Sequence, residues 1–543
     1  MIREKAIQPK NSLLLREEDL EEAVRRIIEE LIILEKPIPK DLDRIRIQVC
    51  RDLHLKRIPS NSEIICRLRQ KEKNKLIPVL RRKPVRTISG IAVIAVMTKP
   101  TNCPHGRCTY CPGGPEQGVP QSYTGREPAA MRGAQNDYDP YQQVRARLSQ
   151  LQAIGHKVDK SELIVMGGTF PATPRSYQHS FLKGCLEGLI GRRTRDLTEA
   201  IRLAETSRVR NVGITVETRP DCIDTSETDS LLSIGVTRVE IGVQNVYDEI
   251  YRLIHRGHKV KDVIEATKTL KDAGLKVCYH MMPGLPGSDP ERDMKGFRTI
   301  FQDEEFKPDM LKIYPCLVLE GTELYDLWRK GEYTPYSDEE ATTLIAEVKK
   351  ITPPWVRIMR VQRDIPSNLI VAGVTHSNLR QLAKKQLEEE GIDCRCIRCR
   401  EIGYRKEPLE AFPGLETLRR EQIIEKASDG TEVFISSEFE DHLVGYLRLR
   451  IPSEVAYRPE IKNCNTSLVR ELRVLGQMIP IGETSLEQWQ HKGLGSGLLS
   501  AAEKIAKEDY DSRKILVTSA IGTRRYYQRL EYKLEGPYMS KKL

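Results

Sequence analysis

The chain has 543 residues, of which 39% are hydrophobic and 30% are charged, and its formal net charge is +10. This composition indicates a soluble globular protein with room for two to four domains. No apolar stretch approaches the roughly 20 residues of a membrane span, and the start Met-Ile-Arg-Glu-Lys-Ala lacks the apolar run of a secretory signal, so we expect a cytoplasmic protein.

The first 86 residues combine a helical pattern with a strong positive charge. Residues 17–34 have the pattern of a helix, and residues 44–86 contain fourteen Lys or Arg against three acidic residues, a net charge of +11. Such a density favours a polyanionic partner, because each phosphate that is neutralised releases condensed counterions. A solvated basic face is the alternative. We predict a small basic helical domain over 1–86, whose candidate nucleic-acid contacts are Arg81, Arg82, Lys83 and Arg86.

From residue 91 onward, short apolar runs recur, as in parallel strands that are buried on both faces. The runs are 91–97, 163–166, 212–216, 238–243, 276–280 and 310–314. Helical stretches lie between them, such as 263–273, which Gly274 would end. Strands that alternate with helices predict βα units, so we expect an α/β fold with a full or partial parallel barrel over residues 87–390.

Three cysteines follow the first of these strands: Cys103, Cys108 and Cys111, in the spacing C-x4-C-x2-C. Three thiols can ligate three irons of a 4Fe-4S cluster and leave the fourth iron open to S-adenosylmethionine (SAM), as radical SAM chemistry requires. The usual spacing in that superfamily, C-x3-C-x2-C, is one residue shorter. A zinc knuckle that lacks a fourth ligand and three structural thiols are the alternatives. The thirteen cysteines of the chain favour metal binding in a reducing compartment over a disulfide framework.

Further candidates for this site follow the later strands, because ligands of a parallel barrel bind at the carboxyl ends of its strands. A Gly-Gly pair lets the backbone approach the methionine part of SAM, and polar side chains could hold its carboxylate and ribose. The candidate SAM-binding residues are Gly167, Gly168, Glu217, Arg219, Gln244 and His280. Lys312 and Tyr314 face the same mouth of the barrel, where they could orient a substrate; a structural role for the lysine is the alternative.

The sequence blocks around these residues resemble the catalytic subunit of the Elongator complex. The blocks are Cys-Pro-His-x-x-Cys-x-Tyr-Cys-Pro-Gly-Gly, Gln-Ser-Tyr-Thr-Gly-x-Glu-Pro, Met-Gly-Gly-Thr-Phe, Glu-Thr-Arg-Pro-Asp, Val-Glu-Ile-Gly-Val-Gln and His-Met-Met-Pro-x-Leu-Pro. The similarity covers nearly the whole chain, in the block order of the family. Known eukaryotic members carry a longer insert between the first two cysteines, so a single-subunit archaeal- or bacterial-type member is the better match.

A second cofactor motif lies near the other end of the chain. It matches the Q/R-x-x-G-x-G/A loop of GNAT acetyltransferases, in which amides at a helix start hold the coenzyme A pyrophosphate. A strand-like run, 472–479, precedes it and a helical pattern, 498–507, follows it. We predict a GNAT domain over 406–543; a lone G-x-G turn is the alternative. The candidate acetyl-CoA residues are Glu471, Leu472, Arg473 and Val474 beside the pantetheine, Gln490, His491, Lys492, Gly493, Leu494, Gly495 and Ser496 in the loop, and Tyr526 and Tyr527 near the thioester.

Between the two catalytic parts, residues 391–405 hold a third motif, Cys394-Arg-Cys396-Ile-Arg-Cys399. Three thiolates could hold a structural zinc with one more ligand from elsewhere. Cys316 is the candidate for that ligand and His376 is its rival. A second iron-sulfur cluster and uncoordinated thiols are the alternatives.

The resemblance to the Elongator subunit implies an activity. Members of this family act on the wobble uridine (position 34) of tRNA and add a carboxymethyl group to carbon five of the base. In the mechanism proposed for them, a SAM-derived radical abstracts hydrogen from the acetyl methyl of acetyl-CoA, the carbon radical adds to uracil, and thioester hydrolysis leaves the carboxylate. By similarity, Lys160 would contact acetyl-CoA, Lys312 and Tyr314 would orient the base or the thioester, and the Tyr527 hydroxyl would assist the leaving sulfur.

Two other functions compete with this one. The first is a protein lysine acetyltransferase with a structural iron-sulfur cluster, and the second is a non-catalytic tRNA-binding scaffold. Glycines and polar strand tips suited to SAM argue against the first, and a scaffold would not need both cofactor loops intact. The expected partner is the anticodon stem-loop of tRNA, while a homodimer, accessory Elongator-type subunits and the choice of tRNAs stay open.

Overall fold

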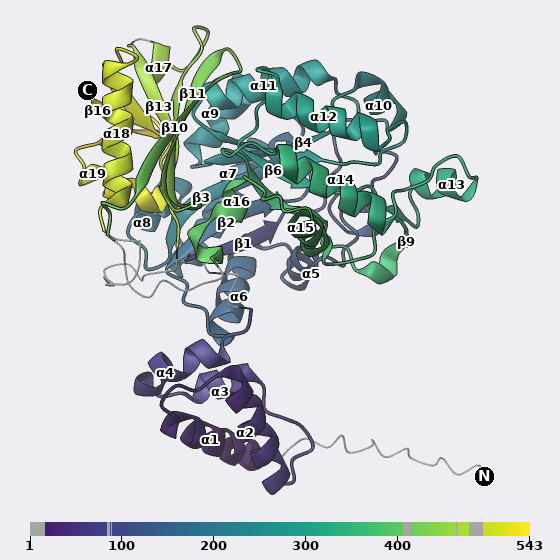
Figure 1. The fold of residues 1–543 in the computed structure, drawn as a ribbon, viewed down its shortest axis with the longest axis vertical. Coiled ribbons are helices and arrows are strands. Elements are labelled where there is room, and N and C mark those ends of the chain that lie inside the picture. Colours follow the sequence, from purple (N-terminus) through teal and green to yellow (C-terminus); the bar gives the residue numbers. More distant parts are fainter. Residues whose placement is uncertain (1–16, 84–86, 88–89, 406–413, 463, 477–491) are drawn as a thin grey trace. The chain divides into compact units, whose positions relative to one another are not determined.

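The computed structural model describes the chain except residues 1–16, 84–86, 88–89, 406–413, 463 and 477–491 (Figure 1). The chain forms two compact units. The first unit contains residues 1–87 and 147–158, and the second contains 88–146 and 159–543. The segment 147–158 therefore groups with the first unit although it lies inside the predicted barrel domain. No helix in the described part of the chain is long and apolar enough to cross a membrane.

The first unit is helical, as predicted. Its helices are α1 (Glu17–Ile33), α2 (Pro39–Asp52), α3 (Asn61–Arg67), α4 (Gln70–Leu80) and the later turns of α6 (Pro140–Ala153). Helix α1 contributes Val24, Ile27 and Leu31 to the apolar core of this unit. These residues share one face because an α-helix repeats every 3.6 residues. Ser60 begins α3 by accepting a hydrogen bond from the Glu63 amide at 3.3 Å.

The second unit begins with a parallel sheet whose strand order follows the sequence. The strands are β1 (Ile91–Met97), β2 (Lys160–Met166), β3 (Arg210–Thr218), β4 (Arg238–Gln244), β5 (Lys276–Met281), β6 (Met310–Ile313) and β8 (Arg357–Arg360). Because β1 and β8 are the two edges, the sheet is a partial barrel. The first six strands confirm the predicted runs, and β1 matches its run residue for residue. The sequence pattern did not predict strand β8, because this strand has arginines at both ends and only two apolar residues.

Helices alternate with these strands and cover the sheet. They are α5 (Pro128–Gln135), α7 (Arg175–Ile190), α8 (Leu197–Ala204), α9 (Thr225–Ser233), α10 (Asp248–Leu253), α11 (Val260–Asp272), α12 (Pro290–Gln302), α13 (Glu323–Arg329), α14 (Asp338–Ile351), α15 (Leu379–Glu389) and α16 (Ile397–Arg400). Gly274, at φ +81°, follows the end of α11, as expected of a residue that ends a helix. A small two-stranded sheet, β7 (Val318–Leu319) with β9 (Ile370–Ala372), lies outside the barrel sheet.

The carboxyl-terminal part of the second unit is a mixed sheet. Its strand order is β10 (Arg419–Ala427), β11 (Gly430–Phe439), β12 (His442–Ile451), β13 (Thr466–Val474), β14 (Lys514–Val517), β16 (Tyr538–Lys542) and β15 (Lys533–Glu535). Strands β13 and β14 are parallel but pair only from Thr466 to Val469, so the later half of β13 diverges from its neighbour. Helix α18 (Leu494–Glu508) connects the two strands, while the short α17 (Pro459–Lys462) and α19 (Arg524–Gln528) complete the fold.

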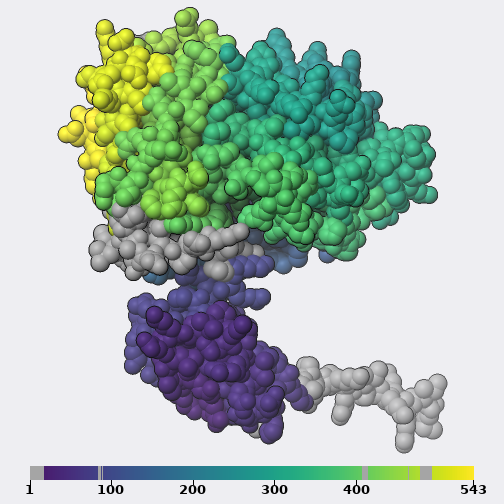
Figure 2. Space-filling model, in the orientation of Figure 1, coloured from purple at the N-terminus to yellow at the C-terminus, as the bar shows by residue number. Residues whose placement is uncertain are grey.

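This architecture confirms the predicted fold class, a partial parallel β/α barrel joined to an α/β domain of the acetyltransferase type, with a small helical amino-terminal part. The predicted strand 472–479 is shifted, since β13 begins at Thr466 and ends at Val474, and residues 477–479 lie outside the described residues. The carboxyl-terminal part, in light green and yellow, lies directly against the later part of the barrel region, in teal and green (Figure 2).

Buried ion pairs join the mixed sheet to the segments that precede β5 and β6 of the barrel. Arg470 of β13 binds Asp309 through two hydrogen bonds, of 2.5 and 2.7 Å, and Arg450 of β12 donates to Asp272 at 2.6 Å. All four side chains are almost completely buried. Removing one partner of such a pair leaves an uncompensated buried charge, which is destabilising. The contact between the two parts therefore depends on these specific ion pairs and not on apolar packing alone.

Candidate active site

The three-cysteine loop lies at the carboxyl end of β1 and receives polar contacts from several segments. The His105 Nε2 lies 3.1 Å from the Cys108 sulfur, the Ser122 hydroxyl lies 2.9 Å from the Cys111 sulfur, and Thr169 Oγ1 lies 3.5 Å from the Cys103 sulfur. Cys108 and Cys111 are buried, and Cys103 is half-buried. Because Thr169 follows the Gly-Gly pair, the structure brings the cysteine loop and the end of β2 together, as predicted.

The spacing of the thiols tests which metal group they fit. Among the described residues, two groups of three potential ligand atoms lie within 4.8 Å of one another, and the triplet Cys103, Cys108 and Cys111 is neither of them. A tetrahedral zinc with Zn–S bonds of roughly 2.3 Å would need sulfurs about 3.8 Å apart. The cysteine triplet is wider than this, and an iron-sulfur cluster needs wider spacing because each cysteine binds a different iron. The spacing therefore favours the cluster over the zinc knuckle.

Packing requires glycine at positions 167 and 168, independently of any role that the pair has in binding a ligand. Gly167 and Gly168 have φ values of +141° and +91°, and a Cβ on Gly167 would lie 1.9 Å from the Thr98 hydroxyl oxygen. A Cβ on Gly168 would lie 3.2 Å from the Gln121 carbonyl oxygen. The pair therefore permits close approach of the cysteine loop and its neighbours, and its role toward SAM stays a prediction.

The polar strand tips are largely engaged with the protein itself. Arg219 is 1% exposed and donates to the Arg256 carbonyl oxygen and to Asp221, each at 2.8 Å. Glu217 accepts a 2.8 Å hydrogen bond from the Tyr123 hydroxyl. Gln244 adopts φ +68° at the end of β4. These three residues lie at the predicted mouth, and their binding of SAM stays a prediction.

Lys312 lies in the barrel interior rather than at its rim. Its ammonium group pairs with Glu240, which is fully buried, and lies 3.8 Å from Glu217. His280 contacts the same Glu240 carboxylate at 2.8 Å, and the Tyr314 ring lies edge-on to His280. Burial alone would raise the pKa of Glu240, but Lys312 and His280 hold it below its ordinary value. Burial would likewise lower the pKa of Lys312, yet Glu240 raises it, so this lysine keeps its charge at neutral pH.

The ion pairs continue through the barrel toward its amino end. Arg238, at the start of β4, lies 3.5 Å from Glu240 and binds Glu162 of β2 at 2.5 Å. Glu162 in turn lies 3.9 Å from Arg473 of β13. The barrel interior is thus lined by alternating charges that extend from the cysteine end to the mixed sheet.

A cavity of about 940 Å³ opens at this amino end. One wall is formed by residues at the starts of barrel strands, among them Lys160, Arg210, Arg238 and Lys276. The other wall is formed by the divergent half of β13, the start of α18 and residues 517–529. The predicted acetyl-CoA residues that line it are Lys160, Glu471, Leu472, Arg473, Val474, Gly493, Leu494, Gly495, Ser496, Tyr526 and Tyr527. Gln490 and His491 lie outside the described residues, and Lys492 is described but does not line the cavity.

The start of α18 has the geometry that an anion site at a helix terminus needs. Gly493 adopts φ +86° immediately before the helix, and a Cβ on Gly495 would lie 3.0 Å from the Tyr526 hydroxyl oxygen. The first amides of a helix have no partner within it and attract anions. Tyr527 packs edge-on against Tyr526, and burial raises its pKa, so its hydroxyl stays protonated at neutral pH.

The two candidate sites lie at opposite ends of the barrel. Strands β1 and β2 have seven residues each, which separates their ends by about 20 Å. The predicted grouping of Lys160 with acetyl-CoA fits this geometry because β2 begins at Lys160. The sequence did not indicate that the amino end of the barrel would itself become a cavity wall.

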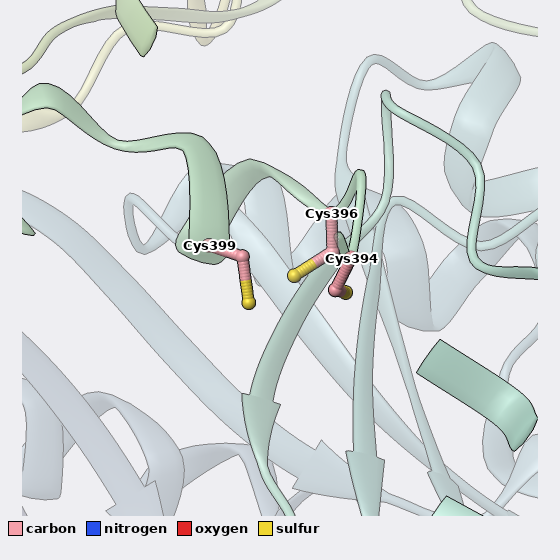
Figure 3. A group of neighbouring side chains, drawn as sticks. All are labelled: Cys394, Cys396 and Cys399. Atoms are coloured by element: carbon pink, nitrogen blue, oxygen red, sulfur yellow. The ribbon is translucent and has the colours of Figure 1, made fainter. Parts of the chain in front are cut away.

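The third motif forms a compact thiol group at α16. The sulfurs of Cys394, Cys396 and Cys399 lie within 4.8 Å of one another and gather on one side of the backbone (Figure 3). This spacing fits a single zinc ion. The Lys349 ammonium of α14 lies 3.2 Å from the Cys399 sulfur; burial would lower its pKa, but the cysteines raise it.

Neither predicted fourth ligand joins this group. Cys316 packs in the core that contains Cys108 and Cys111, where burial raises its pKa to about 12. His376 contacts Asp338 at 2.8 Å. In the described part of the chain, no further histidine, cysteine or carboxylate completes the group of three. The expectation of Cys316 as a zinc ligand is therefore not supported: the thiol is held in another part of the core.

The predicted nucleic-acid residues belong to the first unit. The Arg81 side chain donates to the Gly155 carbonyl oxygen at 3.1 Å, whereas Arg82 and Lys83 are exposed. Arg86 lies outside the described residues. Their contact with tRNA stays a prediction.

Sequence reasoning missed several residues that contact the candidate sites. His105 and Arg256 lie against Cys108, and Lys349 lies against Cys399. His105 could have been noticed inside the Cys-Pro-His block. Arg256 and Lys349 carry no local signal, since each is distant in sequence from the cysteine that it contacts.

The fold and the cysteine loop define a radical SAM protein. The radical SAM superfamily matches residues 98–295, the radical SAM C-terminal domain matches 308–389, and the ELP3 N-terminal domain matches 20–88. The tRNA uridine(34) acetyltransferase of Methanocaldococcus jannaschii is 51% identical over 95% of this chain and 98% of that protein. Elongator complex protein 3 of Schizosaccharomyces pombe is 45% identical over 96% of this chain and 97% of that protein.

A solved structure agrees with these relatives. The archaeal Methanocaldococcus infernus Elp3 with an N-terminal deletion is 46% identical, with a TM-score of 0.74, over 84% of this chain and 100% of that one. The chain therefore belongs to the Elongator complex protein 3 family, which includes the archaeal tRNA uridine(34) acetyltransferases.

Proposed function

We propose that this protein is a tRNA-modifying enzyme that uses a SAM-derived radical and acetyl-CoA to form 5-carboxymethyluridine at position 34 of tRNA. The observation that carries the proposal is that one barrel bears both candidate sites, the three-cysteine loop at its carboxyl end and the acetyltransferase-type cavity at its amino end. The similarity to the archaeal tRNA uridine(34) acetyltransferase supports tRNA as the substrate.

At the carboxyl end, Cys103, Cys108 and Cys111 would hold a 4Fe-4S cluster. When bound, the cluster and SAM supply a carbon radical. The Gly-Gly pair and the polar strand tips surround the place proposed for SAM. Lys312 and Tyr314 are proposed to orient the reacting groups, with Lys312 acting as a permanently charged ammonium fixed by Glu240. It is not suited to act as a base, because its pKa is raised.

At the amino end, the start of α18 is proposed to hold the coenzyme A pyrophosphate on the amides that follow Gly493. The divergent half of β13 offers backbone groups to the pantetheine, since no β14 residue pairs with it beyond Val469. Tyr527 lines the same cavity with a protonated hydroxyl, which can donate its proton to the leaving sulfur.

The competing functions use less of what the structure presents. A protein lysine acetyltransferase would need only the amino-end cavity, and a tRNA-binding scaffold would need neither cofactor site. The polar contacts to all three thiols of the cysteine loop, and a thiol spacing too wide for one zinc ion, favour a working cluster site.

The remaining assignments are proposals of the same kind. Residues 1–86 are proposed to bind the tRNA anticodon stem-loop, 87–390 to form the radical SAM barrel, 391–405 to hold a structural zinc on Cys394, Cys396 and Cys399, and 406–543 to form the acetyltransferase domain. A cytoplasmic location is expected for an enzyme that modifies tRNA.

The test is anaerobic reconstitution of the full chain with iron, sulfide and a reductant, followed by incubation with SAM, isotopically labelled acetyl-CoA and tRNA. Nucleoside mass spectrometry should detect labelled 5-carboxymethyluridine at position 34, and tRNA with cytidine at that position should give none. Label transferred to protein lysines in place of tRNA would support the acetyltransferase alternative and overturn the proposal.

A further inference from the structure

An arginine lies within hydrogen-bond distance of the Cys108 sulfur. The Arg256 Nη1 lies 3.6 Å from the Cys108 sulfur, on the segment between α10 and α11. This distance fits a hydrogen bond to sulfur, which is longer than one to oxygen. Arg256 is only 7% exposed. Its charge, which lies beside the thiol, is therefore largely shielded from water.

Several contacts fix the position of this guanidinium. Arg256 Nη2 donates to the Gly242 carbonyl oxygen at 2.7 Å, and a Cβ on Gly242 would lie only 2.5 Å from that nitrogen. The Arg256 carbonyl oxygen accepts the 2.8 Å hydrogen bond from Arg219. Next to it, a Cβ on Gly257 would lie 2.9 Å from the His105 Cβ. Two glycines therefore leave the room that the arginine and the cysteine loop occupy.

In the described part of the chain, the guanidinium has no carboxylate among its hydrogen-bond partners, which are a carbonyl oxygen and a thiol sulfur. Its Nε has no partner among the described residues. Arg219, the nearest other arginine in this network, instead donates to Asp221. A buried cation without an anionic partner is costly. We therefore expect the group that Cys108 binds to supply the compensating negative charge.

We propose that Arg256 is a positioning residue of the radical SAM site that raises the reduction potential of the 4Fe-4S cluster held by Cys103, Cys108 and Cys111. The proposal concerns the cluster alone and can be tested without tRNA or acetyl-CoA. Its failure is thus distinguishable from failure of the proposed function.

The physical reason is electrostatic. Reduction adds one electron to a cluster that already carries three thiolate ligands, so the reduced state is the more negative one. A fixed cation within hydrogen-bond distance of a ligand sulfur stabilises the reduced state more than the oxidised state, and hydrogen bonds to cluster sulfurs act in the same direction. Burial strengthens the effect because water screens the charge less. The cluster then accepts an electron from a weaker donor.

The experiment is an EPR-monitored redox titration of the anaerobically reconstituted full chain without SAM. Arg256→Met removes both the charge and the N–H donors, Arg256→Gln keeps a donor without charge, and Arg256→Lys keeps the charge without the planar fork. The expected midpoint potential is most negative for the methionine variant, intermediate for glutamine and nearest to the parent for lysine. Arg252→Met, at an exposed position on α10, is the matched control and should keep the parent potential.

Gly242→Ala provides an independent variant in case the buried arginine is needed for folding. Its new methyl group would displace Nη2 while the arginine itself is kept, so it should also give a negative shift, smaller than that of Arg256→Met. Iron and sulfide content must stay at the parent value. A methionine or alanine variant with a full cluster and an unchanged potential overturns the proposal. So does loss of the cluster in both variants with an unchanged melting temperature, because Arg256 would then be required for assembly and not for tuning.

Discussion

The two ends of the barrel are built in different ways. At the carboxyl end, short loops bring thiols, hydroxyls and arginines into a small buried site around Cys103, Cys108 and Cys111. At the amino end, a second sheet packs against the strand starts and leaves a wide cavity with a largely basic wall. The first site suits a compact inorganic cluster, and the second suits a long, multiply charged cofactor.

The difference shows how a general rule can be extended. Chemistry in parallel barrels lies at the carboxyl ends of the strands, and the amino ends usually serve stability. Here the pairing of Arg470 with Asp309 and of Arg450 with Asp272 fixes an acetyltransferase-type sheet at the amino ends. The residues at the starts of β2, β4 and β5 thereby become part of a candidate site.

The largest expected effect is the loss of function at the carboxyl end of the barrel without any effect on the amino end. Replacing Cys103, Cys108 and Cys111 together with Ala should abolish iron binding and SAM cleavage, because no cluster ligand remains, while acetyl-CoA affinity stays within about twofold of the parent. Iron analysis, 5′-deoxyadenosine detection and calorimetry measure the three quantities. SAM cleavage that persists in the reconstituted variant would remove the cysteine loop from the mechanism.

The reverse separation is expected from Gly495→Glu. The new side chain would meet the Tyr526 hydroxyl and place a negative charge at the anion-binding helix start, so acetyl-CoA affinity should fall by about tenfold or more. The cluster should load normally. Ser500→Glu, exposed on the same helix, is the control and should bind acetyl-CoA like the parent. Equal affinities of the two variants would place the pyrophosphate elsewhere.

A third variant should leave both ends untouched. Reversing Arg81, Arg82 and Lys83 to Glu should weaken tRNA binding and flatten the slope of log affinity against log salt, by roughly one unit for each phosphate that the protein no longer neutralises. Filter binding across a salt series measures this slope. Cluster content and acetyl-CoA affinity serve as internal controls. An unchanged slope would move the tRNA-binding surface to another part of the chain.

The smallest effect concerns the charge of the cavity wall. Burial lowers the pKa of Lys276 to about 8, and the charged groups that face it are Glu471, Arg238, Glu162 and Arg473. This lysine is protonated below pH 8 and loses its charge as the pH rises, so affinity for the polyanionic acetyl-CoA should fall by roughly threefold to tenfold between pH 7 and 9.

Two substitutions of Lys276 sharpen this expectation. Lys276→Met should bind more weakly at pH 7 and show a flatter pH dependence, whereas Lys276→Arg should keep its charge to pH 9. Calorimetry at several pH values distinguishes the three proteins. The same pH profile in the methionine variant and the parent would show that another group titrates.

Much of the fold could be predicted because its signals are local. The run 91–97 coincides with β1, and the helix predicted over 17–34 ends one residue beyond α1. Strand β8 was missed because a short strand with arginines at both ends has no apolar period. The strand expected at 472–479 was shifted because the apolar residues that suggested it do not mark where pairing with β14 begins.

The candidate sites were predictable only in part. Motifs such as the cysteine loop and the loop around Gly493 indicate a cofactor by their spacing alone. The assignment of Cys316 to the zinc group failed because spacing says nothing of which distant thiol approaches a triplet. The core that holds Cys316 beside Cys108 and Cys111 is made by residues from many segments.

The sequence by itself determined the class of fold, the cysteine loop and the acetyltransferase-type loop, because periodicity and motif spacing are properties of neighbouring residues. Tertiary structure alone decided that Arg256 lies against Cys108, that Lys349 lies against Cys399 and that Ile91 at the start of β1 shares a cavity with β13. Those contacts join residues 50 to more than 300 positions apart. They depend on how whole strands and helices pack, which the local pattern around any one residue does not specify.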